Sequence, residues 1–347
     1  MHKLLNVATL IFAVFFTAAA TVRAEPTSQT NPRLKRALEQ FPEADANRDG
    51  VLTQSEAQAY LASAPAPDHA NLRYGPHERN VLDLWLAKGD SAAGPRPLVV
   101  YIHGGGWVGG DKSPPLPPGA VKRFLDAGIH FASINYRYST TAPFPAPVRD
   151  GGLAIQYLRH HAGRYNIDPS RVAAYGGSAG AVTSLWLAFR DDMADPAAAD
   201  PVLRESTRLT CAGSIVGPTT LDKKTMDEWF GMKVVVHPAM YPFFGLSPGN
   251  AEALYSDEVR TVAAEASPIH HLSKDDPPVF LDFPQDLEPL TAKHTAGEMV
   301  HHPLFGVKLK EAADQIGVEA IFQARNRPQD KYKDLVEFVI QKLNRPA

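Results

Sequence analysis

A serine between small residues is the first candidate for chemistry in this sequence. Gly176-Gly177-Ser178-Ala179-Gly180 has the G-x-S-x-G pattern, and it lies between an apolar run at residues 172–175 and a helical pattern at residues 181–189. A strand, a sharp turn and a helix in this order lift a serine hydroxyl clear of the sheet, and the turn leaves room only for small flanking residues. The pattern predicts that Ser178 is a nucleophile; a glycine-rich turn without chemistry is the alternative.

A second glycine-rich motif lies upstream of the serine. His103-Gly104-Gly105-Gly106 ends the apolar run at residues 97–102. Glycines leave the backbone N–H groups exposed, and such groups stabilise the negative oxygen that forms when a hydroxyl attacks a carbonyl. We expect the N–H groups of Gly105, Gly106 and Ala179 to form this oxyanion hole, and His103 to be structural.

Short β-rich runs alternate with helical patterns along most of the chain, and these elements must position the two motifs. Such alternation predicts an α/β fold with a mostly parallel sheet and helices on both faces. The expected strands are residues 97–102, 130–138, 172–175, 211–216, 279–283 and 319–323, and the expected helices are residues 120–127, 148–161, 181–189, 307–316 and 331–343.

At the two motifs the chain resembles the α/β-hydrolase superfamily, and within it the HGGG-type serine esterases, which include acetylxylan-esterase-like, feruloyl-esterase-like and hormone-sensitive-lipase-like enzymes. The resemblance spans residues 70–345 and includes Asn135-Tyr136-Arg137-Tyr138, Asp150 and Asp168-Pro169-Ser170-Arg171. It implies a carboxylic-ester hydrolase that acts on short acyl or aryl esters, those of polysaccharides included, and that needs no organic cofactor.

The resemblance also implies that an acid and then a histidine follow the serine along the chain. The strand expected at residues 279–283 leads to Gln285-Asp286-Leu287-Glu288-Pro289. Glu288, which stands directly before Pro289, is the first candidate for the acid, and Asp286 is the second. Solvated loop carboxylates are the alternative.

The histidine is the anomaly of the sequence. The region after the last expected strand, residues 324–330, contains none, and no histidine follows His302. A base must therefore come from His294, His301 or His302, of which the pair before Pro303 is favoured because proline restricts the loop that holds it. If these are ordinary surface histidines, the alternative is a catalytically silent domain that binds a glycan or a protein.

A separate motif near the N-terminus predicts calcium binding. The twelve residues from Asp45 to Glu56 fit the EF-hand loop, and polar helical stretches flank them. A lone loop of this kind predicts modest affinity and a structural role, and a helix–turn–helix that binds nothing is the alternative. The expected ligands are Asp45, Asn47, Asp49, Val51, Thr53 and Glu56.

The remaining sequence indicates organisation and location. Residues 1–24 have the pattern of a secretory signal peptide, with an uncleaved anchor as the alternative. Residues 25–62 form the expected EF-hand module, residues 63–70 a linker, and residues 71–347 the hydrolase domain. A net charge of −3 and a single cysteine, Cys211, argue against nucleic acid, an anionic membrane surface and an intramolecular disulfide. We expect a secreted or periplasmic protein that has no membrane partner after cleavage.

Overall fold

The computed structural model describes residues 25–40, 42–63, 65–89, 94–113 and 118–344. The chain divides into two compact units between Ala59 and Tyr60. The predicted signal peptide lies outside the described residues. The predicted domain boundaries stay predictions, although strand β1, His69–Arg73, begins inside the predicted linker.

The small unit is a helix–loop–helix. Helix α1, Pro32–Gln40, and helix α2, Gln54–Ala62, flank the predicted calcium loop, and a short 3-10 turn follows α1 at Pro42–Ala44. The loop pairs with the chain that precedes α1, because Ser28 N–H donates to the Leu52 carbonyl at 2.8 Å and Leu52 N–H donates to Ser28 Oγ at 3.0 Å. This pairing buries Leu52 completely.

The large unit is built on one eight-stranded sheet with the order β1-β2-β4-β3-β5-β6-β7-β8. The pairs β1–β2 and β2–β4 are antiparallel, and the other pairs are parallel. The remaining strands are β2 Val81–Trp85, β3 Arg96–Ile102, β4 His130–Ile134, β5 Ile167–Gly177, β6 Cys211–Ile215, β7 Val279–Phe283 and β8 Ala320–Ala324.

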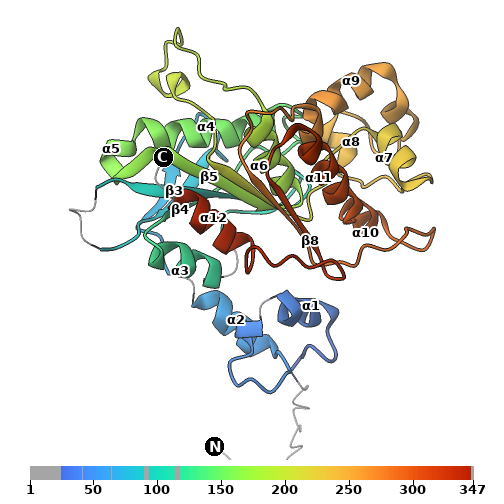
Figure 1. Cartoon of the computed structure of the whole chain (residues 1–347), viewed down its shortest axis with the longest axis horizontal. Helices are drawn as coiled ribbons and strands as arrows, with labels where there is room; N and C mark the ends of the chain where they lie inside the picture. The colour runs from blue at the N-terminus through green and yellow to red at the C-terminus, as the bar shows by residue number, and fades with distance from the viewer. Residues whose placement is uncertain (1–24, 41, 64, 90–93, 114–117, 345–347) are drawn as a thin grey trace, which may run out of the picture. The chain divides into compact units, whose positions relative to one another are not determined.

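Helices cover both faces of this sheet (Figure 1). Successive side chains of a strand point to opposite faces, so in β3 Leu98, Val100 and Ile102 belong to one apolar core and Val99 to the other. Helices α4, α6 and α11 pack on the first face, and α3 and α12 pack on the second. The structure thus confirms the predicted α/β architecture.

The helices of the large unit have the following bounds. They are α3 Pro118–Asp126, α4 Ala146–His160, α5 Ala162–Tyr165, α6 Ala179–Phe189, α7 Lys223–Phe230, α8 Met240–Phe243, α9 Asp257–Ala266, α10 Ala296–Val300, α11 Leu304–Ile316 and α12 Leu335–Leu343, with 3-10 turns at Pro201–Arg204, Glu252–Tyr255 and Pro268–His270. No helix in the described part of the chain has the length and apolar character needed to cross a membrane.

Candidate active site

Ser178 lies at the sharp turn between β5 and α6. Its backbone has φ 53° and ψ −118°, a left-handed conformation that non-glycine residues rarely adopt. A side chain at Gly176 or Gly180 would overlap the carbonyl oxygen of Ile102. The small residues of the motif are therefore required by the close approach of β3, as the sequence predicts, and the turn presents the serine at the carboxyl edge of the sheet.

The loop after β3 presents bare backbone beside this serine. Gly105 and Gly106 have φ of +97° and +61°, and the Gly105 carbonyl accepts from Val108 N–H and Gly109 N–H at 3.0 and 3.1 Å. A side chain at Gly104 would lie 3.5 Å from Ser178 Cβ, so the two motifs are in contact. Among the described residues, no hydrogen-bond partner is found for the N–H groups of Gly105, Gly106 and Ala179. The three donors predicted for the oxyanion hole are thus available to a substrate.

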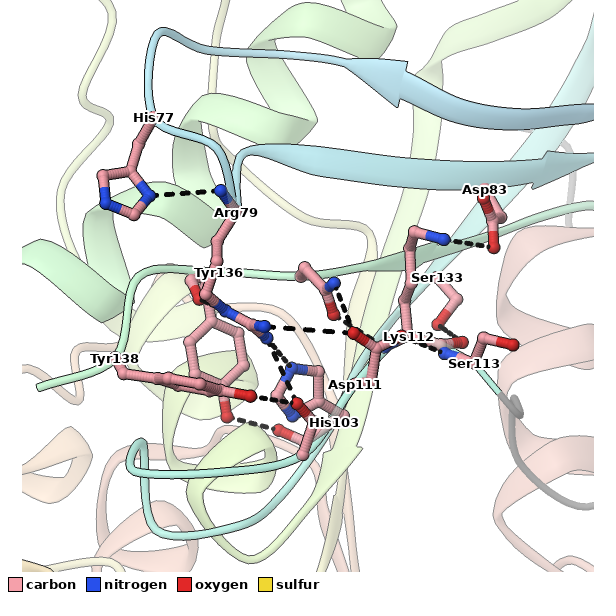
Figure 2. A network of polar contacts seen from close by, with 12 residues as sticks. His77, Arg79, Asp83, His103, Asp111, Lys112, Ser113, Ser133, Tyr136 and Tyr138 are labelled. Atoms are coloured by element: carbon pink, nitrogen blue, oxygen red, sulfur yellow. Dashed lines mark hydrogen bonds and ion pairs between the residues drawn. The ribbon is translucent and has the colours of Figure 1, made fainter.

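A polar network supports the loop of residues 104–106, which we call the glycine loop (Figure 2). His103 donates from Nδ1 to the Gly104 carbonyl at 2.7 Å, while its Nε2 lies 3.4 Å from a guanidinium nitrogen of Arg79. Burial lowers the pKa of His103 to about 4, so the ring is neutral at pH 7 and Nε2 accepts from Arg79. Tyr136 Oη donates to the carbonyls of His103 and Gly104 at 2.8 and 3.0 Å. Arg79 also stacks on the Tyr138 ring, 3.7 Å from its centroid. These contacts give His103 a structural role in support of the loop after β3.

His301 is the histidine that the structure brings to the serine. Its Nε2 lies 2.8 Å from Ser178 Oγ. The residue follows α10, and the main cause that lowers its pKa to about 4 is burial, with a smaller contribution from the nearby His237; a hydrogen bond to the Gly297 carbonyl acts in the opposite direction. The imidazole is therefore neutral at pH 7 and has the protonation state that a general base needs.

The other two candidate histidines are not brought to the serine. His302 is buried, with Nε2 2.6 Å from the backbone carbonyl of Glu288 and Nδ1 accepting from Leu304 N–H at 3.1 Å. His294 Nδ1 bonds to Thr291 N–H at 3.0 Å on the preceding loop. Both ring nitrogens of His302 are therefore engaged in hydrogen bonds with backbone groups. His302 supports the local structure, and the prediction of this residue as a candidate for the base is corrected.

Glu288, the residue predicted to be the acid, does not hydrogen-bond to the base. The Glu288 side chain is exposed, and the residue meets His302 through its backbone carbonyl. Asp286 pairs at 3.6 Å with Arg325. The chain after β7 is tied to the turn after β8, since Arg325 N–H donates to the Gln285 carbonyl at 3.0 Å. Within the described ranges no carboxylate hydrogen-bonds to His301, so the expectation of Glu288 as the orienting acid is corrected.

One residue near the site was missed by the sequence analysis. A methyl carbon at Gly106 would lie 3.8 Å from His237 Cε1, and His237 is close enough to His301 to lower its pKa. The segment that carries it also packs on the glycine loop, where the Trp107 and Phe243 rings stack with centroids 4.0 Å apart. No spacing in the sequence connects His237 with Ser178, because their proximity depends on the path of the chain between α7 and α8.

The predicted calcium loop is internally hydrogen-bonded. Gly50, with φ +81°, donates its N–H to Asp45 Oδ2 at 2.8 Å, and Val51 N–H donates to Asp49 Oδ1 at 2.8 Å. Asp45 Oδ1 is buried without a hydrogen-bond partner. The expected ligand Glu56 instead accepts from Thr53 N–H and Oγ1 at 3.0 and 2.8 Å, which caps α2. No group of three or more acidic, histidine or cysteine side chains poised to hold a metal is found in the part of the chain that the structure describes.

Among the curated relatives of this chain are two esterases from Mycobacterium tuberculosis. The probable carboxylic ester hydrolase LipM is 27% identical over 216 residues, which are 61% of this chain and 46% of LipM. The esterase LipQ is 29% identical over 218 residues, which are 62% of this chain and 48% of LipQ. The chain therefore spans about half the length of these relatives.

Solved structures show the same fold at low sequence identity. A truncated form of a carbohydrate esterase from gut microbiota matches with a TM-score of 0.60 and 21% identity, over 81% of this chain and all (100%) of the other. An acetyl ester-xyloside bifunctional hydrolase from Caldicellulosiruptor lactoaceticus matches with a TM-score of 0.56 and 20% identity, over 76% and 88% of the two chains. The BD-FAE family model matches residues 82–285, which is more than half of the 347 residues. The chain has the α/β-hydrolase fold and belongs to the BD-FAE family.

Proposed function

We propose that this chain is a carboxylic ester hydrolase in which Ser178 is the nucleophile and His301 the general base. The observation that carries the proposal is the distance of 2.8 Å between Ser178 Oγ and His301 Nε2. A neutral imidazole at this distance accepts the hydroxyl proton, and the free N–H groups of the glycine loop lie beside the same serine. The esterases LipM and LipQ among the relatives support this reaction class.

The proposed reaction has two halves. Ser178 Oγ attacks the acyl carbon as its proton passes to His301, and the carbonyl oxygen becomes an oxyanion stabilised by the N–H groups of Gly105, Gly106 and Ala179. Collapse of this intermediate breaks the ester C–O bond, and the leaving alcohol takes the proton from His301. Water then gives a proton to the same imidazole and attacks the acyl-serine; the imidazolium returns this proton to Ser178 Oγ as the acyl C–O bond breaks, which releases the carboxylic acid and restores both residues.

The imidazolium formed in this reaction faces a backbone carbonyl in place of a carboxylate. The Gly297 carbonyl acts on the His301 ring in the direction that favours its charged form. A carbonyl dipole stabilises a cation less than a full negative charge does, so this arrangement favours a weakly basic histidine.

Short acyl esters of carbohydrates, together with simple aryl esters, are the substrates that we propose. The support is the likeness to a carbohydrate esterase and to an acetyl ester-xyloside hydrolase.

Turnover of p-nitrophenyl acetate by the full chain tests the proposal. We expect Ser178→Ala and His301→Ala each to lower kcat/KM by at least about 10³-fold, because each removes a member of one catalytic unit. His294→Ala is the matched control, since this histidine lies on the same segment without contacting Ser178. Turnover that survives Ser178→Ala would overturn the role of Ser178, whereas a folded wild type without turnover of this and of natural acetyl esters would leave the silent binding domain as the better account.

We also propose that the loop from Asp45 to Glu56 binds one calcium ion. The twelve-residue pattern, the two flanking helices, the positive φ of Gly50 and the unpartnered Asp45 Oδ1 support the proposal. The ion would be held by the side-chain oxygens of Asp45, Asn47, Asp49, Thr53 and Glu56 and by the Val51 carbonyl, and its role would be structural.

Export is the third proposal, and it depends on the pattern of residues 1–24 alone. A periplasmic or extracellular protein whose N-terminus lies at Glu25 is expected. Mass measurement of the protein recovered from each cell fraction checks it, and a full-length cytoplasmic product would contradict it.

A further inference from the structure

The segment between α7 and α8 places a histidine at the edge of the catalytic site. Val235 N–H donates to Met299 Sδ at 3.2 Å, which ties the segment to α10, the helix that ends at His301. Two residues after His237, Ala239 closes on the glycine loop so tightly that a methyl carbon at Gly106 would lie 2.6 Å from its Cβ. His237 is thus held between the loop that presents the oxyanion donors and the helix that presents the base.

The hydrogen bonding of His237 determines which of its nitrogens carries the proton. Ala239 N–H points to His237 Nδ1 at 3.3 Å, so Nδ1 is the acceptor. Burial lowers the pKa of His237, and the ring is neutral at pH 7. The single proton is then on Nε2, for which the described residues supply no acceptor. An N–H donor without a partner among the described residues therefore lies between the glycine loop and α10.

Both oxygens of the ester group already have hydrogen-bond partners in the proposed mechanism. The carbonyl oxygen belongs to the N–H groups of the glycine loop and Ala179, and the leaving oxygen belongs to His301, which must return its proton. The Nε2–H group of His237, which lies between the glycine loop and α10, is therefore next to the alcohol part of a bound ester. A sugar offers an acceptor there, in the hydroxyl beside the esterified oxygen, whereas a simple phenol does not.

We propose that His237 is a substrate-contacting residue whose Nε2–H donates a hydrogen bond to the hydroxyl oxygen next to the ester in a sugar or other polyol. This inference rests on the proposed esterase function and deepens it, because it names the part of the substrate that the site recognises. It assigns to this chain a preference for esters of alcohols with a free neighbouring hydroxyl.

A matched substrate pair tests the preference. The first is a methyl xyloside that carries one acetyl group beside a free hydroxyl, and the second is the same compound with that hydroxyl replaced by hydrogen. We expect the wild type to prefer the first in kcat/KM by about 2- to 10-fold, the range of a hydrogen bond between uncharged groups. His237→Phe should abolish this ratio, and His237→Gln, whose amide places a donor near the position of Nε2, should retain part of it.

The control is His160→Phe. His160 ends α4, and a crossover helix between parallel strands ends at the sheet edge opposite to the one where Ser178 lies. The variant should keep the wild-type ratio. Equal rates of the wild type on both substrates would overturn the role of His237, and so would a ratio that survives in His237→Phe. In either case, turnover that depends on Ser178 would still support the esterase function. Absence of turnover of either compound by a wild type that hydrolyses p-nitrophenyl acetate would overturn the role of His237 alone, and absence of turnover of all three esters would overturn both.

Discussion

The imidazole of His301 lies in surroundings that suit a base of low pKa. It is 2.8 Å from Ser178 Oγ, and no carboxylate among the described residues hydrogen-bonds to it. Burial and the neighbouring His237 both disfavour its charged form. The proton transfer from Ser178 is therefore made efficient by proximity and by the oxyanion donors, more than by strong basicity.

The pH dependence of kcat/KM follows from this environment. The reaction needs neutral His301, whose pKa is lowered to about 4, whereas an ordinary histidine has a pKa of about 6.5. Activity should stay on its plateau as the pH falls to about 5 and be lost as the pH falls through about 4. Initial rates on p-nitrophenyl acetate check this, with far-ultraviolet circular dichroism as the control for acid unfolding. An acid limb at pH 6.5 in the folded protein would contradict the placement of His301.

Among the single residues of the site, those whose role depends on local backbone geometry could be predicted from the sequence. Ser178 and the glycines at 104–106 are recognisable because the turn and the bare loop allow only such residues. The sequence could not show which of His301 and His302 is the base, since these adjacent residues differ only in the direction that their side chains take after α10. Glu288 was misplaced for the same reason, because its backbone faces the histidine segment while its side chain is exposed.

The strands and helices place these groups by a regular rule. Parallel strands end at one edge of the sheet, so Ser178 after β5 and the glycine loop after β3 meet there, and β3 and β5 pair from Leu98–Val172 to Ile102–Gly176. Periodicity predicted the cores of these elements well. It extended β4 too far, to residue 138 instead of 134, because Tyr136 and Tyr138 alternate with polar residues as in a strand, whereas their hydroxyl groups support the loop after β3.

The helix–loop–helix leads to a prediction at the scale of an element. Calorimetric titration should detect one calcium ion with a Kd on the order of 10⁻⁴ to 10⁻³ M. Asp45→Asn should abolish the binding, because it removes the charge from the buried ligand whose Oδ1 has no protein partner. The exposed Asp191→Asn is the control, since Asp191 lies in the large unit. No heat of binding, or equal binding by Asp45→Asn, would refute the calcium site.

Over the whole molecule, the large unit supplies a rigid frame for a site assembled from distant segments. The serine, the glycine loop, the base and His237 come from parts of the chain separated by up to about two hundred residues, and both faces of the sheet are covered by packed helices. Composition and periodicity predicted this architecture because burial on both faces determines the pattern of every central strand. They did not predict the long-range contacts of the segments after β6 and β7, where the base and His237 are placed.

The most direct test of the central claim is labelling by an organophosphate that reacts with activated serines, with the site located by peptide mass spectrometry. We expect one equivalent of label on Ser178 in the wild type, a labelling rate constant at least about 10²-fold lower in His301→Ala, and no change in His294→Ala. Label on another residue, or labelling of Ser178 at the wild-type rate in folded His301→Ala, would contradict the proposal that these two side chains form the catalytic pair.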